Sequence, residues 1–379
     1  MIGTILDTIG ETPLVRIPNS NMPNEGQVLL KYERYNPGGS IKDRAALYIV
    51  TEAERRGWLK PGGTIIESSS GNFGISLAMI GAARGYRVII LVDPKTTEAN
   101  LALIRCFGAE VIVVTEQDDS GSYHKTRISL ANKLAREIEH SFRPDQCFSL
   151  LNGAAHYRGT AREIVSHCPG RLAAIVCAVS TGGQLGGISR YVKTFAPGVR
   201  VVGVDAEGSG IFGGATAPYR IPGIGLGWTP TNVSLELVDC AYKVGDEQAF
   251  LTARAFARHE GILMGPSSGA CALVALKLAQ ELDPSDVVVC MVADGGDRYI
   301  HTLFNNEWMS RQGFGADADV ETLRDMARAL RPWSESPASG ANYRRDLAER
   351  LEVPESTLRL NSEFLARGYE HPQASLYID

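Results

Sequence analysis

The feature that most constrains the fold of this chain is a regular alternation of short apolar runs and longer amphipathic stretches, which begins at Gly63. The apolar runs are rich in Val and Ile and end at polar or glycine residues, as is typical of strands buried on both faces of a parallel sheet. They cover residues 64–67, 87–92, 111–114, 173–179, 199–204 and 287–292. Stretches between them, such as 73–83, 99–107 and 123–139, space their apolar residues as helices do. We therefore predict an α/β protein with helices on both faces of mostly parallel sheets.

A polar break at residues 143–145 divides this alternation into two groups. A chain of 379 residues is long enough for two hydrophobic cores. We expect a small α/β domain over residues 45–145 and a large, cofactor-binding α/β domain formed by 1–44 together with 146–312. Two early strands, 13–16 and 28–33, must join one of the sheets.

The composition of the chain shifts after Gly313. Three helices are predicted there, over residues 320–330, 343–351 and 355–369, separated by proline and glycine residues. We expect residues 313–379 to form a C-terminal helical extension.

The composition excludes several classes of function. Charged residues make up 21% of the chain and the formal net charge is -5, with no block of basic residues that would favour nucleic acid. No apolar run approaches the roughly eighteen residues of a membrane span, and the N-terminus does not resemble a signal peptide, so we expect a cytoplasmic protein. The seven cysteines are dispersed without a C-x-x-C pair, so no metal site is expected.

Residues 36–44 (NPGGSIKDR) place a lysine at the start of a helix that follows a strand. Ser40 and Asp43 have the spacing of a capping box, which puts Lys42 in the first helical turn. The positive end of the helix dipole disfavours the ammonium form there and favours the neutral amine that attacks a carbonyl. Lys42 is thus a candidate for holding an aldehyde cofactor. The alternative is a solvated surface lysine.

Residues 67–74 (ESSSGNFG) form a second junction between a strand and a helix. Backbone N–H groups at the helix start, with the side chains of Ser69, Ser70 and Asn72, can orient the carboxylate of an amino acid. A purely structural cap would need only one of these side chains.

Residues 180–187 (STGGQLGG) lie between another strand and an amphipathic helix. Their glycines allow backbone amides to converge on an anion, and Thr181 adds a hydroxyl donor, so a phosphate site is predicted. Asp205 closes the next strand about twenty residues later, as in dinucleotide-binding folds. Because the G-x-G-x-x-G fingerprint is absent, a nicotinamide dehydrogenase is the less favoured interpretation.

Residues 265–270 (GPSSGA) form a fourth loop-to-helix junction. The hydroxyl of Ser267 can meet a cofactor ring nitrogen, although a serine in this position is often only a helix cap. A neutral partner leaves a pyridine ring unprotonated and makes it a weaker electron sink, which suits elimination at the β-carbon.

Taken in this order, the four segments resemble the fold-type II pyridoxal-phosphate family of cysteine synthases and cystathionine β-synthases, over residues 1 to about 312. The resemblance implies two doubly wound open-sheet domains with the active site between them, and pyridoxal 5'-phosphate as cofactor. It makes Lys42 the Schiff-base lysine, with Asn72 at the cofactor's 3'-oxygen and Ser267 at its pyridine nitrogen. The phosphate group would be held by Ser180, Thr181, Gly182, Gly183 and Gln184. The substrate carboxylate would be flanked by Ser69, Ser70, Gly71 and Asn72.

Further segments resemble the siderophore-pathway branch that makes N-(2-amino-2-carboxyethyl)-L-glutamate, a precursor of 2,3-diaminopropionate. They are residues 92–95 (VDPK), 122–127 (SYHKTR), 205–209 (DAEGS), 222–225 (PGIG) and 294–299 (DGGDRY). This implies a β-replacement transferase that acts on O-phospho-L-serine through an aminoacrylate, with the amine of L-glutamate as nucleophile. Gly223 is then a substrate-binding residue. Arg127 is the candidate for binding the leaving phosphate through paired hydrogen bonds, against the alternative of a helix-surface arginine.

The chain also departs from the family pattern. Phe73 replaces the second threonine of the T-S-G-N-T loop, and Leu150 and Leu151 stand where the family often has Gln or Gln-Tyr. These departures leave the second substrate open. The alternatives are a cysteine or S-sulfocysteine synthase that uses sulfide or thiosulfate, and a non-catalytic regulatory binder. The resemblance also implies small-molecule amino-acid substrates and a homodimer.

Overall fold

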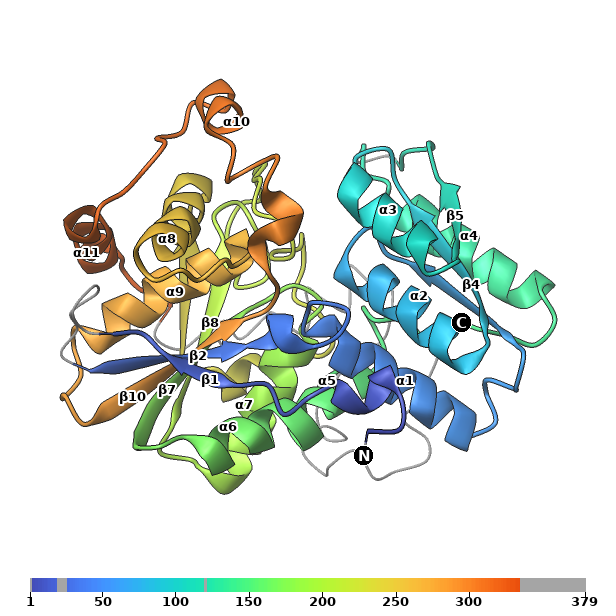
Figure 1. Ribbon diagram of the computed structural model, residues 1–379, viewed down its shortest axis with the longest axis horizontal. Coiled ribbons are helices and arrows are strands. Elements are labelled where there is room, and N and C mark those ends of the chain that lie inside the picture. The colour runs from blue at the N-terminus through green and yellow to red at the C-terminus, as the bar shows by residue number, and fades with distance from the viewer. Residues whose placement is uncertain (1, 19–25, 119–120, 335–379) are drawn as a thin grey trace.

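The structure, a computed structural model, describes residues 2–18, 26–118 and 121–334. Two α/β units, each built around its own sheet, lie side by side (Figure 1). The larger sheet has the strand order β1-β2-β10-β7-β8-β9, and the smaller one has the order β5-β4-β3-β6. The chain therefore has the predicted α/β fold class.

The larger sheet is parallel except at one edge. There, β1 (Leu14–Arg16) pairs antiparallel with β2 (Gln27–Tyr32), and all other neighbours run parallel. Its remaining strands are β10 (Asp286–Val292), β7 (Arg171–Ala178), β8 (Arg200–Ala206) and β9 (Cys240–Val244). All residues of β10 are buried, as expected for a strand covered on both faces.

Helices cover both faces of the larger sheet. One face packs against α8 (Asp246–His259), α9 (Pro266–Ala279) and α11 (Val320–Ala329). The other packs against α6 (Ala161–His167) and α7 (Gly183–Phe195). The short helix α5 (Leu151–Ala155) continues through a π-helical turn, η3 (His156–Thr160), into α6, and α10 (Asn306–Arg311) precedes α11. The 3₁₀ helices are η1 (Ile5–Thr8), η2 (Glu33–Tyr35), η4 (Leu235–Leu237) and η5 (Gly296–Tyr299).

The smaller sheet is wholly parallel. It consists of β3 (Thr64–Ser68), β4 (Arg87–Val92), β5 (Glu110–Val113) and β6 (Ser141–Phe142). One face packs against α1 (Lys42–Arg55), α2 (Asn72–Arg84) and α3 (Glu98–Cys106), and the other against α4 (His124–Glu137). Both sheets are thus doubly wound, and loops after the carboxyl ends of their strands are placed to form a site.

The structure also corrects and limits the predictions. The strands β6 and β9 were not predicted: β6 has only two residues, and Tyr and Lys interrupt the apolar run of β9. The predicted helix over 320–330 is confirmed as α11, whereas those over 343–351 and 355–369 lie outside the described residues. The domain boundaries remain a prediction. Across the described ranges, every helix is too short or too polar to cross a lipid bilayer.

Candidate active site

A cavity of about 540 Å³ is lined by residues from both units. The loops that follow β2, β3, β7 and β10 all contribute to its wall. Every residue that the sequence predicted for the site lies in this wall: Lys42, Ser69, Ser70, Gly71, Asn72, Arg127, Ser180, Thr181, Gly182, Gly183, Gln184, Gly223 and Ser267. Segments distant in sequence therefore meet in one place, while their individual roles stay predictions.

Lys42 is the first residue of α1, as predicted, and it is partly buried in the cavity wall. Burial lowers the pKa of its ammonium group, and the nearby Cys147 thiol and Asp294 carboxyl only partly oppose this effect. The pKa shift is therefore in the expected direction, toward the neutral amine, and desolvation is a major cause of it. A neutral amine is the form that bonds to an aldehyde.

The predicted capping box at this helix start is wrong. The Ser40 hydroxyl accepts a hydrogen bond from the Lys42 N–H (3.3 Å), but the Asp43 carboxylate does not return to the Ser40 backbone. Instead Asp43 accepts hydrogen bonds from the Gly38 N–H (2.6 Å) and the Ser76 hydroxyl. Burial raises the pKa of Asp43 to about 6 despite these donors. The Asp43 side chain thus joins the lysine loop, residues 36–42, to α2 rather than capping α1.

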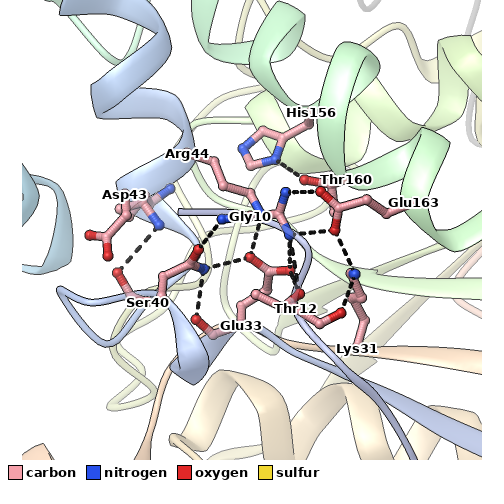
Figure 2. A network of polar contacts seen from close by, with 12 residues as sticks. Gly10, Thr12, Lys31, Glu33, Ser40, Asp43, Arg44, His156, Thr160 and Glu163 are labelled. Carbon is pink, nitrogen blue, oxygen red and sulfur yellow. Dashed lines mark hydrogen bonds and ion pairs between the residues drawn. The ribbon is translucent and has the colours of Figure 1, made fainter. Parts of the chain in front are cut away.

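An ion-pair network surrounds Arg44, which is two residues beyond Lys42 in the chain (Figure 2). The Arg44 guanidinium donates to both carboxylate oxygens of Glu33 (2.6 and 2.9 Å) and to both of Glu163 (2.6 and 2.7 Å). Lys31 adds a 2.6 Å bond to Glu163, and the exposed fractions of these four residues range from 0% to 6%. Their charges sum to zero, so the buried network is electrically balanced.

This network connects the two units at the point where Lys42 enters the cavity. Glu33 follows β2, and Glu163 lies on α6, so both belong to the larger unit, whereas Arg44 lies on α1 of the smaller one. Burial acts to raise the pKa of Glu163, but hydrogen bonds from Arg44 and Lys31 lower it to about 2. The ion pairs therefore fix α1, and with it the lysine loop, against the larger sheet.

The serine-rich loop at 69–72 leads into α2. The Ser69 hydroxyl accepts a hydrogen bond from the Gly74 N–H (3.0 Å), and the Ser70 hydroxyl donates to Asp93 (2.9 Å). Both side chains thus have protein partners. The first-turn N–H groups of a helix lack intrahelical acceptors, so they are the donors best placed for a substrate carboxylate.

The glycine-rich loop at 180–187 leads into α7. Gly182 has a φ of +83°, and a side-chain carbon at Gly183 would lie 2.0 Å from Asn152 Oδ1. Only glycine allows this close packing of the first turn. The Gln184 amide nitrogen is buried without a hydrogen-bond acceptor among the described residues, so the loop has a donor available for an anion.

Ser267 lies in the first turn of α9, is 4% exposed, and faces the cavity wall near Gly223. Its neighbour Ser268 instead accepts a hydrogen bond from the Ala293 N–H (3.0 Å). The two adjacent serines therefore have different surroundings, and only Ser267 lines the cavity.

Arg127 reaches the cavity from α4. Its guanidinium forms an ion pair with Asp93 (3.1 Å) and donates to the Ser70 hydroxyl, with 11% of the side chain exposed. Its Nε has no hydrogen-bond acceptor among the described residues. Arg127 is thus a cavity residue rather than a helix-surface arginine, but one that already has a carboxylate partner.

The site includes a segment to which the sequence assigned no site role, residues 293–299. The Asp294 carboxylate accepts hydrogen bonds at Oδ2 from the Asn72 amide (2.8 Å) and the Tyr299 hydroxyl (2.7 Å). Arg298 donates to the Gly38 carbonyl of the lysine loop, and the Ile41 N–H donates to the Ala293 carbonyl (2.8 Å). The sequence signal was present, because these polar residues directly follow a buried strand.

These residues fit pyridoxal phosphate, the cofactor that the resemblance implies. The α7 start offers a glycine-lined anion site with an unsatisfied amide donor, Lys42 lies in the wall with a lowered pKa, and Ser267 presents a hydroxyl from α9. All three lie in the wall of one cavity, as a single bound molecule requires.

The chain is similar to several known proteins. Residues 5–294 match the family model of pyridoxal-phosphate dependent enzymes. A probable cysteine synthase of Bacillus subtilis (strain 168) is 40% identical over 307 residues, which cover 80% of this chain and 97% of that protein. The N-(2-amino-2-carboxyethyl)-L-glutamate synthase of Cupriavidus metallidurans is 36% identical over 314 residues, covering 81% and 91%. The crystal structure of an O-ureido-L-serine synthase superposes with a TM-score of 0.75 at 33% identity, covering 82% and 99%.

Proposed function

The chain belongs to the family of pyridoxal-phosphate dependent enzymes, and on that premise we propose that it joins an amino-acid amine, such as that of L-glutamate, to the β-carbon of O-phospho-L-serine. The product would be a precursor of 2,3-diaminopropionate. The chain is a cysteine-synthase-like transferase of the β-replacement class. The leaving group, the nucleophile and the product are the proposed parts.

The charge of the cavity wall is the observation that supports this proposal. Apart from Lys42, for which the neutral amine is favoured, its basic side chains are Lys95, Arg127, Arg220 and Arg298. Among the described residues the wall has a single carboxylate, that of Asp294. Such a wall favours substrates with several negative charges, as a phosphorylated amino acid and a dicarboxylic amino acid have. Sulfide, which is small and has one charge at most, does not explain so many cations.

The proposed reaction assigns separate tasks to the residues of the wall. When bound, the cofactor supplies an electron sink that stabilises negative charge at the substrate α-carbon. Lys42, whose pKa is lowered by desolvation, accepts the α-proton and later returns it to the product. The first turn of α2 binds the substrate carboxylate, and Arg127 binds the phosphate that leaves.

A cysteine or S-sulfocysteine synthase is the alternative, favoured by the identity with the Bacillus subtilis protein. A non-catalytic binder, the other alternative that the sequence left open, does not agree with membership of a cysteine-synthase-like enzyme family.

In the deciding experiment, the holoenzyme is incubated with O-phospho-L-serine and one nucleophile, which is L-glutamate, sulfide or thiosulfate. The products are identified by mass spectrometry. We expect a glutamate adduct and released phosphate, and neither from Lys42→Ala. If sulfide or thiosulfate is consumed and no amino acid ever is, the proposal is wrong and the alternative is correct.

We propose further that the protein is a cytoplasmic homodimer, which rests on family resemblance. Light scattering checks the dimer by a mass near twice the 40.9 kDa of one chain. A mass of one chain over the working concentration range contradicts it.

A further inference from the structure

Asp294 stands out as an acidic side chain in an otherwise basic wall. It follows the carboxyl end of β10 and is 2% exposed. Its Oδ2 is the atom on which Asn72, from the smaller unit, and Tyr299 converge, and both of these residues also line the cavity. The carboxylate therefore lies where the serine-rich loop at 69–72, predicted to bind substrate, meets the larger unit.

Asp294 is also close to the lysine loop. Ser40 and Asp294 form an isolated β-bridge, which holds their backbones side by side. The carboxyl group is near enough to Lys42 to affect the pKa of that lysine. Asp294 is thus close to both Lys42 and Asn72, two of the residues predicted to hold the cofactor.

The carboxylate is poorly compensated for a buried charge. Within the ranges that the structure describes, no cation lies in ion-pair contact with it, and Oδ1 has no hydrogen-bond donor. Burial raises the pKa of Asp294, helped by Asp297 and opposed by Arg298, Asn72 and Tyr299. A carboxyl group whose pKa is shifted toward neutrality is a better proton acceptor than a surface aspartate.

An amine nucleophile requires such an acceptor. Near neutral pH the amine of an amino acid is an ammonium ion, and it must lose one proton before its lone pair can bond to carbon. Thiosulfate, in contrast, attacks as an anion without this step. Apart from Lys42, which is assigned to the α-proton, Asp294 is the group of the wall best suited to take this proton.

We propose that Asp294 is the general base for the nucleophile: it accepts one proton from the incoming amine. The inference rests on the proposed function and names the chemical class of the second substrate, an ammonium compound. The N–H bond breaks and its proton passes to the Asp294 carboxylate, while the nitrogen lone pair forms the bond to the substrate β-carbon. The phosphate departs beforehand with the electron pair of the C–O bond, and Asp294 releases its proton to water when the product leaves.

The test separates this role from mere support of Asn72. In Asp294→Asn holoenzyme, two rates are measured: the burst of phosphate from O-phospho-L-serine before any nucleophile is added, and the subsequent reaction with L-glutamate. Effects of the substitution on shared steps cancel in the ratio of these rates. We expect the ratio to fall by about 100-fold, the lower end of general-base effects.

The matched control is Asp297→Asn, on the same loop. Asp297 pairs with Arg34, is 53% exposed at its side chain and does not line the cavity, so the ratio should change far less than in Asp294→Asn, because only a minor influence on the pKa of Asp294 is lost. If Asp294→Asn does not retain cofactor, Asp294→Ser replaces it, because serine is small and polar and has no carboxylate.

A pH series provides an independent check. As the pH rises from 7 to 9, a growing fraction of glutamate has a free amine that needs no base. The rate of the reaction with glutamate in Asp294→Asn should therefore approach the wild-type rate. If the rate with glutamate in Asp294→Asn stays below wild type by a constant factor over this pH range, Asp294 is not the base. Equal losses in the phosphate burst and in the reaction with glutamate also overturn this assignment. Wild-type enzyme that reacts with no amino acid overturns the proposed function and this inference together, whereas a wild-type ratio retained in the variant overturns the inference alone.

Discussion

At the scale of single residues, Arg127 is the side chain by which the choice of leaving group can be tested. It already pairs with Asp93, yet its unsatisfied Nε and its place in the wall leave it able to bind an anion. We expect Arg127→Gln to raise KM for O-phospho-L-serine by roughly 10- to 100-fold, the size of a lost charge-assisted hydrogen bond. Steady-state kinetics with O-acetyl-L-serine should show a much smaller change.

The control for Arg127 is Lys133→Gln on the same helix, because Lys133 is 62% exposed at its side chain and pairs only with Glu137 among the described residues. It should change KM for neither substrate. Equal increases of KM for the phosphorylated and acetylated substrates in Arg127→Gln would show that the arginine supports the loop and does not recognise phosphate.

Gly183 tests the proposed phosphate site. An alanine methyl group there would lie 2.0 Å from Asn152 Oδ1, so Gly183→Ala must displace either Asn152 or the first turn of α7. We expect the Kd for pyridoxal phosphate to rise about tenfold or more, equivalent to about 1.4 kcal/mol. Titration of the stripped enzyme with cofactor measures this change. Gly198→Ala, just beyond the other end of α7, has no heavy atom within 4 Å of the added carbon and should bind cofactor normally.

Single residues also show where sequence reasoning reaches its limit. The placement of Lys42 at a helix start was predictable, because a local pattern determines it. The partners of Asp43 were not, because Ser76 is 33 residues away and only tertiary packing brings it close. Asp294 is similar: its position after a strand was visible, but its bond to Asn72 spans 222 residues.

At the scale of elements, the ion-pair network explains how β2, α1 and α6 are joined. Glu163→Gln removes a buried negative charge that contacts both Arg44 and Lys31. We expect a loss of about 3–5 kcal/mol in the free energy of unfolding, because two buried cations lose their shared partner. Urea denaturation measures it. Glu110→Gln breaks an ion pair whose side chains are 50% and 54% exposed, and should cost less than about 1 kcal/mol.

The same carboxylate predicts a pH dependence. The pKa of Glu163 is lowered from 4.5 to about 2 in the folded protein, so its stabilising effect is complete above pH 4.5 and is lost as the pH falls toward 2. Glu163→Gln lacks this group. The stability difference between wild type and variant should therefore shrink over that interval, and a difference that stays constant would contradict the assigned pKa.

Among the elements, those with strong periodicity were predicted and those shaped by their neighbours were not. Val- and Ile-rich strands such as β4 and β10 follow directly from the sequence. In contrast, β6 exists because two residues pair with β3, and the π-helical turn η3 joins α5 to α6 without a local signal. In both segments, interactions with neighbouring parts of the chain determine the secondary structure more than the local sequence does.

At the scale of the whole molecule, the cavity wall draws on loops of both sheets, and this predicts how the protein responds to loss of its cofactor. A ligand that contacts both units stabilises only the folded arrangement, by about 2.7 kcal/mol at a hundredfold excess over Kd. We expect the stripped enzyme to melt at a lower temperature than the holoenzyme. Its amide hydrogens should also exchange faster at residues 36–42 and at the starts of α7 and α9.

The position of α11 makes this prediction specific to the cavity. Its buried residues Leu323 and Ala327 pack in the core with α8 and α9, and no part of α11 lines the cavity. Amide exchange in α11 should therefore not change when the cofactor is removed, and readdition of pyridoxal phosphate should restore the melting temperature. Faster exchange throughout both units would mean that the cofactor stabilises the fold as a whole, whereas an unchanged melting temperature would mean that the ion pairs between Arg44 and its carboxylates already hold the units together without it.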